Sequence, residues 1–128
     1  MTDALTAPQG LAEMIDTIEE AYEFMLAYAA HGVREESDSS GPSIRDFISR
    51  ASEAVGGLAD SVRPLLGSSA GEFVALLTAD ANAAQAALRL VLSCRSISSQ
   101  LVDNLNGSIH LRTLLTDLFL IDEAIKNS

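Results

Sequence analysis

The chain has 128 residues, of which 48% are hydrophobic, and its formal net charge is −10. This length fits one domain that is large enough to bury a core of its own. The hydrophobic fraction excludes a disordered chain, and the negative charge argues against a nucleic-acid surface and against binding to an anionic membrane.

The sequence contains one cysteine, Cys94, so it forms no intramolecular disulfide, and a reducing compartment such as the cytoplasm is expected. The first residues lack the basic and apolar regions of a signal peptide. No apolar run approaches the roughly 20 residues that cross a bilayer. We therefore expect residues 1–128 to form a single cytoplasmic domain with no membrane partner.

A first helix is predicted over about residues 8–31, where apolar residues recur at spacings of three and four. Pro8 suits a first helical turn, and Gly32 is typical of the position that follows a helix end. The acidic residues of this segment fall largely off the apolar stripe, which makes the helix amphipathic. Residues 33–41 follow as a polar connecting loop.

A second helix is predicted over about 43–65. Ser43 begins a capping-box motif, with Asp three residues later where Glu is more usual. The apolar stripe is interrupted at Gly56-Gly57, which indicates a kink or a close contact between helices. Pro64 then bends or ends the helix, because it lacks a backbone N–H.

A third helix is predicted over about 70–94. Ser69 and Glu72 have the Ser-x-x-Glu spacing of a capping box. Alanines cover much of the helix surface, so the helix is apolar around most of its circumference. Such a helix is usually central or packs against a second subunit. Because a two-fold dimer is the commonest oligomer, we predict a homodimer.

The last third of the chain has two interpretations. In the first, the third helix ends near Arg95 and a fourth runs over about 98–125, irregular at Gly107. In the second, the third helix continues and turns at Asn106-Gly107. We prefer the first, because four helices of similar length with short links favour an all-α, antiparallel up-down four-helix bundle. A kink or split of the last helix near Gly107 is left open.

The sequence contains no recognisable catalytic, nucleotide-binding or nucleic-acid-binding motif, so we expect a protein that is not an enzyme and needs no cofactor. Glu13, Asp16, Glu20 and Glu23 follow a 3-4-3 spacing, which lines their carboxylates along one side of the first helix. A di-iron bundle site would need Glu-x-x-His pairs, which are absent. We therefore expect no metal site and interpret this acidic row as a solvated face or as a surface for a basic partner. A buried structural thiol is the default for Cys94.

Two aromatic residues accompany the acidic row. Phe24 lies off the apolar stripe and Tyr28 lies near its edge, and such aromatic side chains can mark a protein interface. We therefore predict an accessory, adaptor or regulatory protein that works by salt-sensitive contact with a Lys- or Arg-bearing protein partner. The alternative is a sensor that holds a small molecule or cofactor between helices near Gly56-Gly57 and His110.

Overall fold

The computed structural model describes residues 3–37 and 43–127, with side chains described from residue 10 onward. This part of the chain contains α-helices and short 3-10 turns but no β-strand, which confirms the prediction of an all-α protein. The α-helices are α1 (Asp3–Ala30), α2 (Ile44–Gly56), α3 (Leu58–Val62), α4 (Gly71–Leu92), α5 (Ser99–Gly107) and α6 (His110–Lys126).

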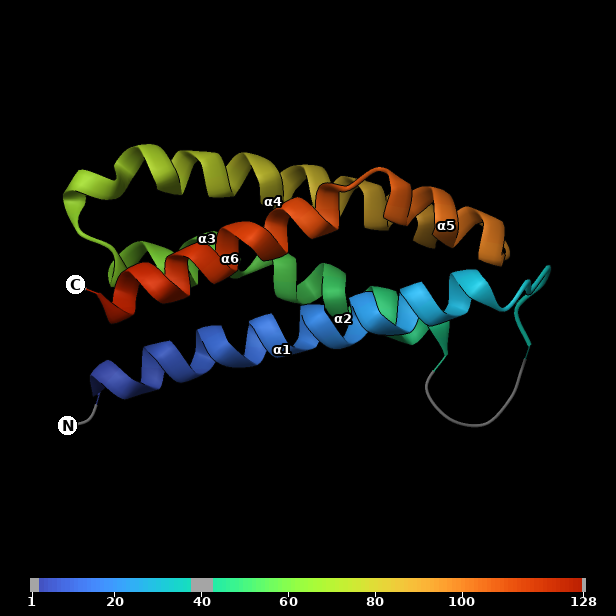
Figure 1. Ribbon diagram of the computed structural model, residues 1–128, viewed down its shortest axis with the longest axis horizontal. Helices are drawn as coiled ribbons and strands as arrows, with labels where there is room; N and C mark the ends of the chain where they lie inside the picture. Colours follow the sequence, from blue (N-terminus) through green and yellow to red (C-terminus); the bar gives the residue numbers. More distant parts are fainter. Residues whose placement is uncertain (1–2, 38–42, 128) are drawn as a thin grey trace.

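The helices lie side by side along the long axis of the molecule (Figure 1). The chain runs outward on α1, returns through α2 and α3, runs outward again on α4 and returns through α5 and α6. Helices α1 and α4 each pack against α2, α3, α5 and α6. The links over 63–70 and 93–98 are short, so each joins neighbouring helix ends and makes the helices on its two sides antiparallel.

The core lies along the centre of this arrangement and is built from one side of each helix. Its largest fully buried side chains are aliphatic: Ile18, Met25, Ile48, Leu58, Leu77, Leu88, Ile97, Leu114, Leu118 and Ile121. Burying each of these side chains stabilises the fold by about 1.5–3 kcal/mol before entropy is counted. The 3–4 spacing of these residues therefore explains why the chain forms helices and which side of each helix faces inward.

The predicted helix over 43–65 is divided, which corrects the expectation of one continuous helix. Helix α2 ends at Gly56, α3 begins at Leu58, and a 3-10 turn follows over Arg63–Leu65. At Gly57 the backbone has φ −98° and ψ −4°, away from the helical minimum. A Cβ atom there would lie 3.2 Å from the terminal methyl group of Met14. The break thus occurs where the Met14 side chain of α1 packs against the backbone.

The predicted helix over 98–125 is also divided, at the position that the sequence left open. Helix α5 ends at Gly107 and α6 begins at His110. Between them Ile109 takes a left-handed conformation, with φ 61°, which interrupts the right-handed helix at this residue. Six helices in the described residues therefore replace the four that were predicted.

The helix ends test the capping predictions. The capping box at Ser43 is present, with reciprocal bonds between Ser43 and Asp46. The box predicted at Ser69 is not formed: Ser68–Ala70 is a 3-10 turn, and α4 starts after Ala70 without a side-chain cap. Of the two interpretations of the last third, the first agrees with the structure, because α4 ends at Leu92.

The N-terminal helix begins earlier than expected. Helix α1 starts at Asp3 rather than near Pro8, in a segment that Ala and Leu residues favour as helix. It ends at Ala30, and Gly32 follows with φ 67°, the left-handed conformation that glycine adopts readily after a helix end. Helix α1 thus has the C-terminus that its sequence predicts.

Candidate functional site

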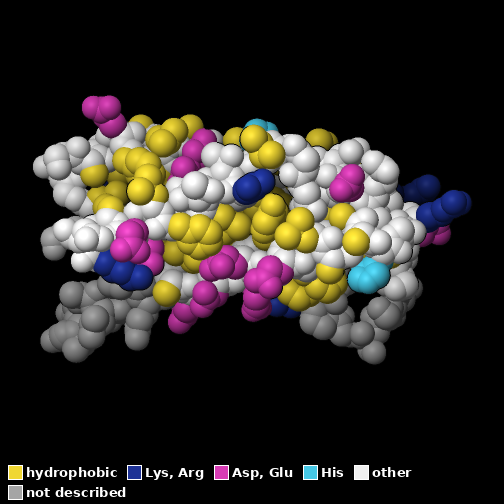
Figure 2. All heavy atoms as spheres, in the orientation of Figure 1, with side chains coloured by type: hydrophobic (Ala, Val, Ile, Leu, Met, Phe, Trp, Pro, Cys, Tyr) yellow, Lys and Arg dark blue, Asp and Glu magenta, His cyan; other side chains and the backbone are white. Residues whose placement is uncertain are grey.

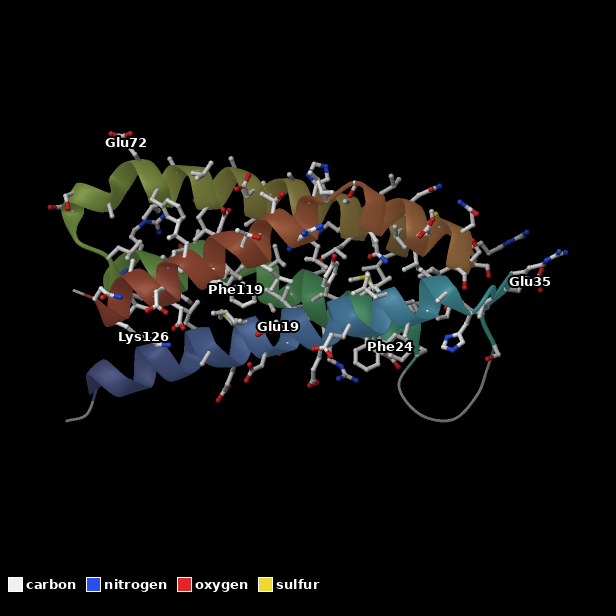
Figure 3. The ribbon with its side chains drawn as sticks, viewed as in Figure 1. Glu19, Phe24, Glu35, Glu72, Phe119 and Lys126 are labelled. Carbon is white, nitrogen blue, oxygen red and sulfur yellow. The ribbon has the colours of Figure 1, made fainter. Side chains whose placement is uncertain are left out.

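A groove of about 280 Å³ lies on the surface between α1 and α6. Its lining residues are Glu19, Tyr22, Glu23, Arg112, Leu115, Thr116 and Phe119. Glu19 and Phe119 lie on the facing sides of the two helices (Figure 3). We call this feature the α1–α6 groove.

Helical spacing explains how these side chains come together. Tyr22 lies three residues after Glu19, and Phe119 lies four residues after Leu115, so each pair projects from one side of its helix. Leu115 is buried against the core, whereas Phe119 is 49% exposed. Figure 2 shows hydrophobic side chains gathered along the middle of this face, with acidic side chains along α1 below them. The groove is therefore an apolar strip with an acidic wall.

The charges of the groove are not satisfied internally. Within the described residues, neither Glu19 nor Glu23 forms an ion pair, and Arg112 at the opposite wall does not reach them. An apolar side chain could pack on Tyr22 and Phe119 while a cationic group approaches the two carboxylates. Chemically, the arrangement can bind an amphipathic segment.

In the structure, the residues of the predicted acidic row border different surface features. Glu13, Asp16, Glu20 and Glu23 are all exposed, but only Glu23 lines the α1–α6 groove. Glu20 instead borders a small recess with Phe47 and Arg50 of α2. The four carboxylates share the solvent side of α1 and not one binding site.

Phe24 and Tyr28 are partly buried on the side of α1 that faces α2. The ring of Phe24 stacks on that of Phe47, with centroids 4.2 Å apart. The hydroxyl of Tyr28 donates a 2.6 Å hydrogen bond to the carbonyl of Ile97, and burial, followed by the nearby Glu36 carboxylate, raises the pKa of Tyr28. Both residues thus hold elements of the fold together, and their role in partner binding stays a prediction.

The sequence reasoning overlooked Glu19, Tyr22, Arg112, Leu115 and Phe119 as a site. A signal was present: Phe119 lies off the apolar stripe of the last helix, just as Phe24 lies off that of the first. The same criterion applied to both helices would have selected Phe119. What the sequence could not supply was the pairing of α1 with α6.

A dense set of polar contacts ties four segments together at the end of the molecule where α1 meets α2. Arg45 donates to both carboxylate oxygens of Glu36, at 2.7 and 3.2 Å, and to the carbonyls of Leu92 and Cys94, at 2.8 and 3.0 Å. Glu36 also accepts from the N–H of Ile97 at 2.7 Å. We call these five residues the Glu36–Arg45 cluster. The hydrogen bonds from Arg45, followed by the bond from the backbone, lower the pKa of Glu36 against the effect of burial.

Two carboxyl groups meet between α4 and α6. Burial, followed by a hydrogen bond with Asp80 and the charge of Asp80, raises the pKa of Asp117 to about 7. The Oδ2 atom of Asp117 is buried, and no amide or hydroxyl group in the described part of the chain donates to it. Two carboxyl groups can share a hydrogen bond only if one of them keeps a proton. We therefore expect the seam between α4 and α6 to respond to pH near neutrality.

A larger recess of about 510 Å³ lies beside the start of α5, but its walls are mainly polar. Its serines are already used within the fold: Ser98 caps α5, and the hydroxyl of Ser99 donates to the carbonyl of Tyr28 while it accepts from the N–H of Val33. We therefore regard the recess as a surface depression and the smaller α1–α6 groove as the candidate site.

The region considered for a small-molecule sensor is filled by side chains. Gln85 lies against Gly56 and donates a 2.8 Å hydrogen bond to the carbonyl of Ser52, and Met14 covers Gly57. His110 is exposed at the start of α6. Among the described residues, no three His, Cys, Asp or Glu side chains are grouped to hold a metal ion.

Comparisons with known proteins found no match to this chain, whether to a protein-family model, a curated protein or a solved structure. In the part of the chain that the structure describes, no helix has the length and apolar character needed to cross a membrane.

Proposed function

We propose that this protein is a non-enzymatic accessory or regulatory protein that binds a basic, amphipathic segment of a protein partner in the α1–α6 groove. The observation that carries the proposal is the exposed Phe119 ring beside the unpaired carboxylates of Glu19 and Glu23. When a partner covers an exposed aromatic ring, the burial of its apolar surface contributes more binding free energy than contacts with exposed carboxylates alone.

The position of the groove supports a helical occupant. It runs between two long helices, and such grooves bind amphipathic helices through residues at spacings of three and four. The acidic wall selects Lys or Arg on one edge of that helix, and the net charge of −10 steers a cationic partner toward the protein. Binding in this mode weakens as salt is added.

Two further aspects belong to the same proposal. We infer that α2 with α3, and α5 with α6, each act as one broken member of an up-down four-helix bundle, a rigid frame for a groove. The partly buried thiol of Cys94, which is not in a disulfide, is compatible with a reducing, cytoplasmic location.

The test is a titration of the labelled full chain, followed by NMR, with a synthetic helical peptide of about 18 residues that carries leucines on one face and lysines along one edge. We expect shifts of the amides around Glu19, Tyr22 and Phe119. Phe119→Ser should weaken binding about tenfold or more. Glu19→Gln combined with Glu23→Gln should weaken binding and reduce its salt dependence.

Two controls make the result decisive. The matched variant Glu72→Gln removes an exposed carboxylate at the start of α4, outside the groove, and should leave binding unchanged. A peptide with glutamates in place of lysines should not bind. Shifts centred on Phe24 and Tyr28, or equal loss of affinity in Glu72→Gln, would refute the α1–α6 groove as the site.

A further inference from the structure

The two walls of the α1–α6 groove carry opposite charges. Arg112 lines the groove from α6, whereas the carboxylates of Glu19 and Glu23 line it from α1. Arg112 is exposed, and within the described residues its guanidinium forms no ion pair. Its backbone carbonyl accepts a 3.0 Å hydrogen bond from the hydroxyl of Thr116, a contact that does not involve the guanidinium. The groove thus has a cation on one wall and two carboxylates on the other.

Arg112 and Phe119 lie on one line along α6. They are seven residues apart, which corresponds to two helical turns and about 10 Å. Glu123 lies four residues beyond Phe119, so the same line continues with a negative charge. Lys126 follows, but its charge is paired with Asp122 at 3.2 Å. Along α6 the wall therefore changes from cationic through aromatic to acidic, and its cationic end lies near the start of the helix.

Contacts within the described residues do not account for the charge of Arg112. It occupies the first turn of α6, which contains no acidic residue. A cation in that turn is unfavourable, because the N-terminus of a helix is the positive end of its dipole. Asp117 borders a shallow depression together with Arg112 but does not pair with it. Burial, followed by the contact with Asp80, raises the pKa of Asp117 to about 7, so this carboxyl group is only partly charged at neutral pH. A group of opposite charge on another molecule would explain an arginine at this position.

We propose that the helical segment bound in the α1–α6 groove carries an acidic residue that pairs with Arg112, in addition to its basic residues, and this proposal rests on the proposed function. A helix that lies in the groove presents its apolar side to Tyr22 and Phe119. One of its edges then faces α1 and the other faces α6. Because Glu19 and Glu23 line one wall and Arg112 the other, the two edges of the partner need opposite charges.

The spacing of charges in the groove determines their spacing in the partner. Glu19 and Glu23 are four residues apart, so two cations four residues apart on one edge of the partner can each reach a carboxylate. On the other edge, the acidic residue must lie about two turns from the apolar residue that covers Phe119, because two turns separate Phe119 from Arg112. An acidic residue level with Phe119 would instead lie nearer to Glu123 and be repelled. The groove thus discriminates between two positions of one negative charge, which general attraction to an acidic protein cannot do.

The test measures the affinity of fluorescent peptides for the full chain by anisotropy at low salt. Each peptide has about 18 residues, with leucines on one face and two lysines four residues apart on one edge. The reference peptide has glutamine at two positions, two turns apart, on the other edge. Two further peptides have glutamate in place of one of these glutamines, at either the N-terminal or the C-terminal position. These two peptides therefore have the same composition and net charge.

The lysine edge fixes the direction of the peptide, so one of the two glutamate positions lies at Arg112. We expect that peptide to bind about two- to fivefold more tightly than the reference, and the other glutamate peptide to bind no more tightly than the reference. Arg112→Gln should abolish the gain. The matched control Arg89→Gln removes the charge of an exposed arginine in the last turn of α4, outside the groove, and should retain the gain. The comparison between protein variants cancels the effect of the glutamate position on the helicity of the free peptide.

Charge reversal gives a second measurement that a loss of folding cannot imitate. In Arg112→Glu, a peptide with lysine at the preferred position should bind more tightly than the peptide with glutamate there. The acidic pairing alone would be overturned if the reference peptide bound but neither glutamate peptide gained affinity, if both gained equally, or if the gain persisted in Arg112→Gln. If the reference peptide did not bind at all, the groove would be refuted as a partner site and the pairing with it.

Discussion

Replacing Asp117 with Asn removes the ionisable group that is held between α4 and α6. In the folded protein the pKa of Asp117 is raised from 3.8 to about 7, chiefly by burial and then by Asp80. The folded state therefore binds more protons than the unfolded state between about pH 4 and pH 7. The free energy of unfolding must fall as the pH rises through this window and stay low above it.

The size of the effect follows from the shift. At about 1.4 kcal/mol per pH unit, the change from 3.8 to about 7 corresponds to about 4 kcal/mol. Asp117 is only partly buried, so solvent screening reduces this value, and we expect about 1–3 kcal/mol. Asp117→Asn should therefore be more stable than the unchanged protein by this amount at pH 8 and about equally stable at pH 4.

Urea unfolding followed by circular dichroism at several pH values between 4 and 8 measures the difference. The matched control is Asp16→Asn, which removes an exposed carboxylate of α1 and should keep the pH dependence of the unchanged protein. The reasoning would be refuted if Asp117→Asn were less stable at pH 8, or if its free energy of unfolding fell with pH as steeply as before.

Three further changes test other parts of the fold by urea or thermal unfolding. Arg45→Met removes four hydrogen bonds of the Glu36–Arg45 cluster and should lower the free energy of unfolding by about 2 kcal/mol at pH 7. Because pairing lowers the pKa of Glu36 below 4.5, this loss should shrink as the pH falls through the folded-state value, and a constant loss would contradict the assignment. Ile109→Gly should raise the free energy of unfolding of the monomer by about 1 kcal/mol through relief of its left-handed strain, and a decrease would show that the side chain stabilises the monomer. Gly56→Ala places a Cβ atom 2.8 Å from Nε2 of Gln85, so loss of the bond from that amide should make it about 1 kcal/mol less favourable than the matched change Gly10→Ala, which has open space around it.

The helical class could be predicted because the 3–4 spacing of apolar residues recurs in each of the four segments that were predicted to be helical. Residues such as Ile18, Met25, Leu88 and Leu118 are buried as their spacing requires. The breaks were harder to place. The sequence marks Gly56-Gly57 and Gly107 as weak points, but whether a helix bends or ends there depends on the neighbour that packs against it, here Met14 at Gly57.

The candidate site was less predictable, because it depends on which helices become neighbours. The acidic character of α1 is visible in the sequence, yet only Glu23 of the predicted row meets an apolar strip. Phe24 and Tyr28 were selected because they lie off, or at the edge of, the apolar stripe of one helix. In the structure Phe24 contacts Phe47 and Tyr28 contacts Ile97, so both residues have structural roles. The contact between Asp80 and Asp117 likewise joins positions far apart in the chain, and the residue spacing within a single helix cannot predict it.

The Glu36–Arg45 cluster limits where evolution can lengthen this chain. In the turn between α4 and α5, Arg45 of α2 binds the carbonyl of Cys94, and Glu36 of the α1–α2 connection binds the N–H of Ile97. An inserted residue there would break several bonds at once. The link between α3 and α4, at the opposite end of the molecule (Figure 1), consists of exposed residues around Gly67 and Ser69. Loop-closure entropy grows only slowly with length, so new segments are tolerated best at that link.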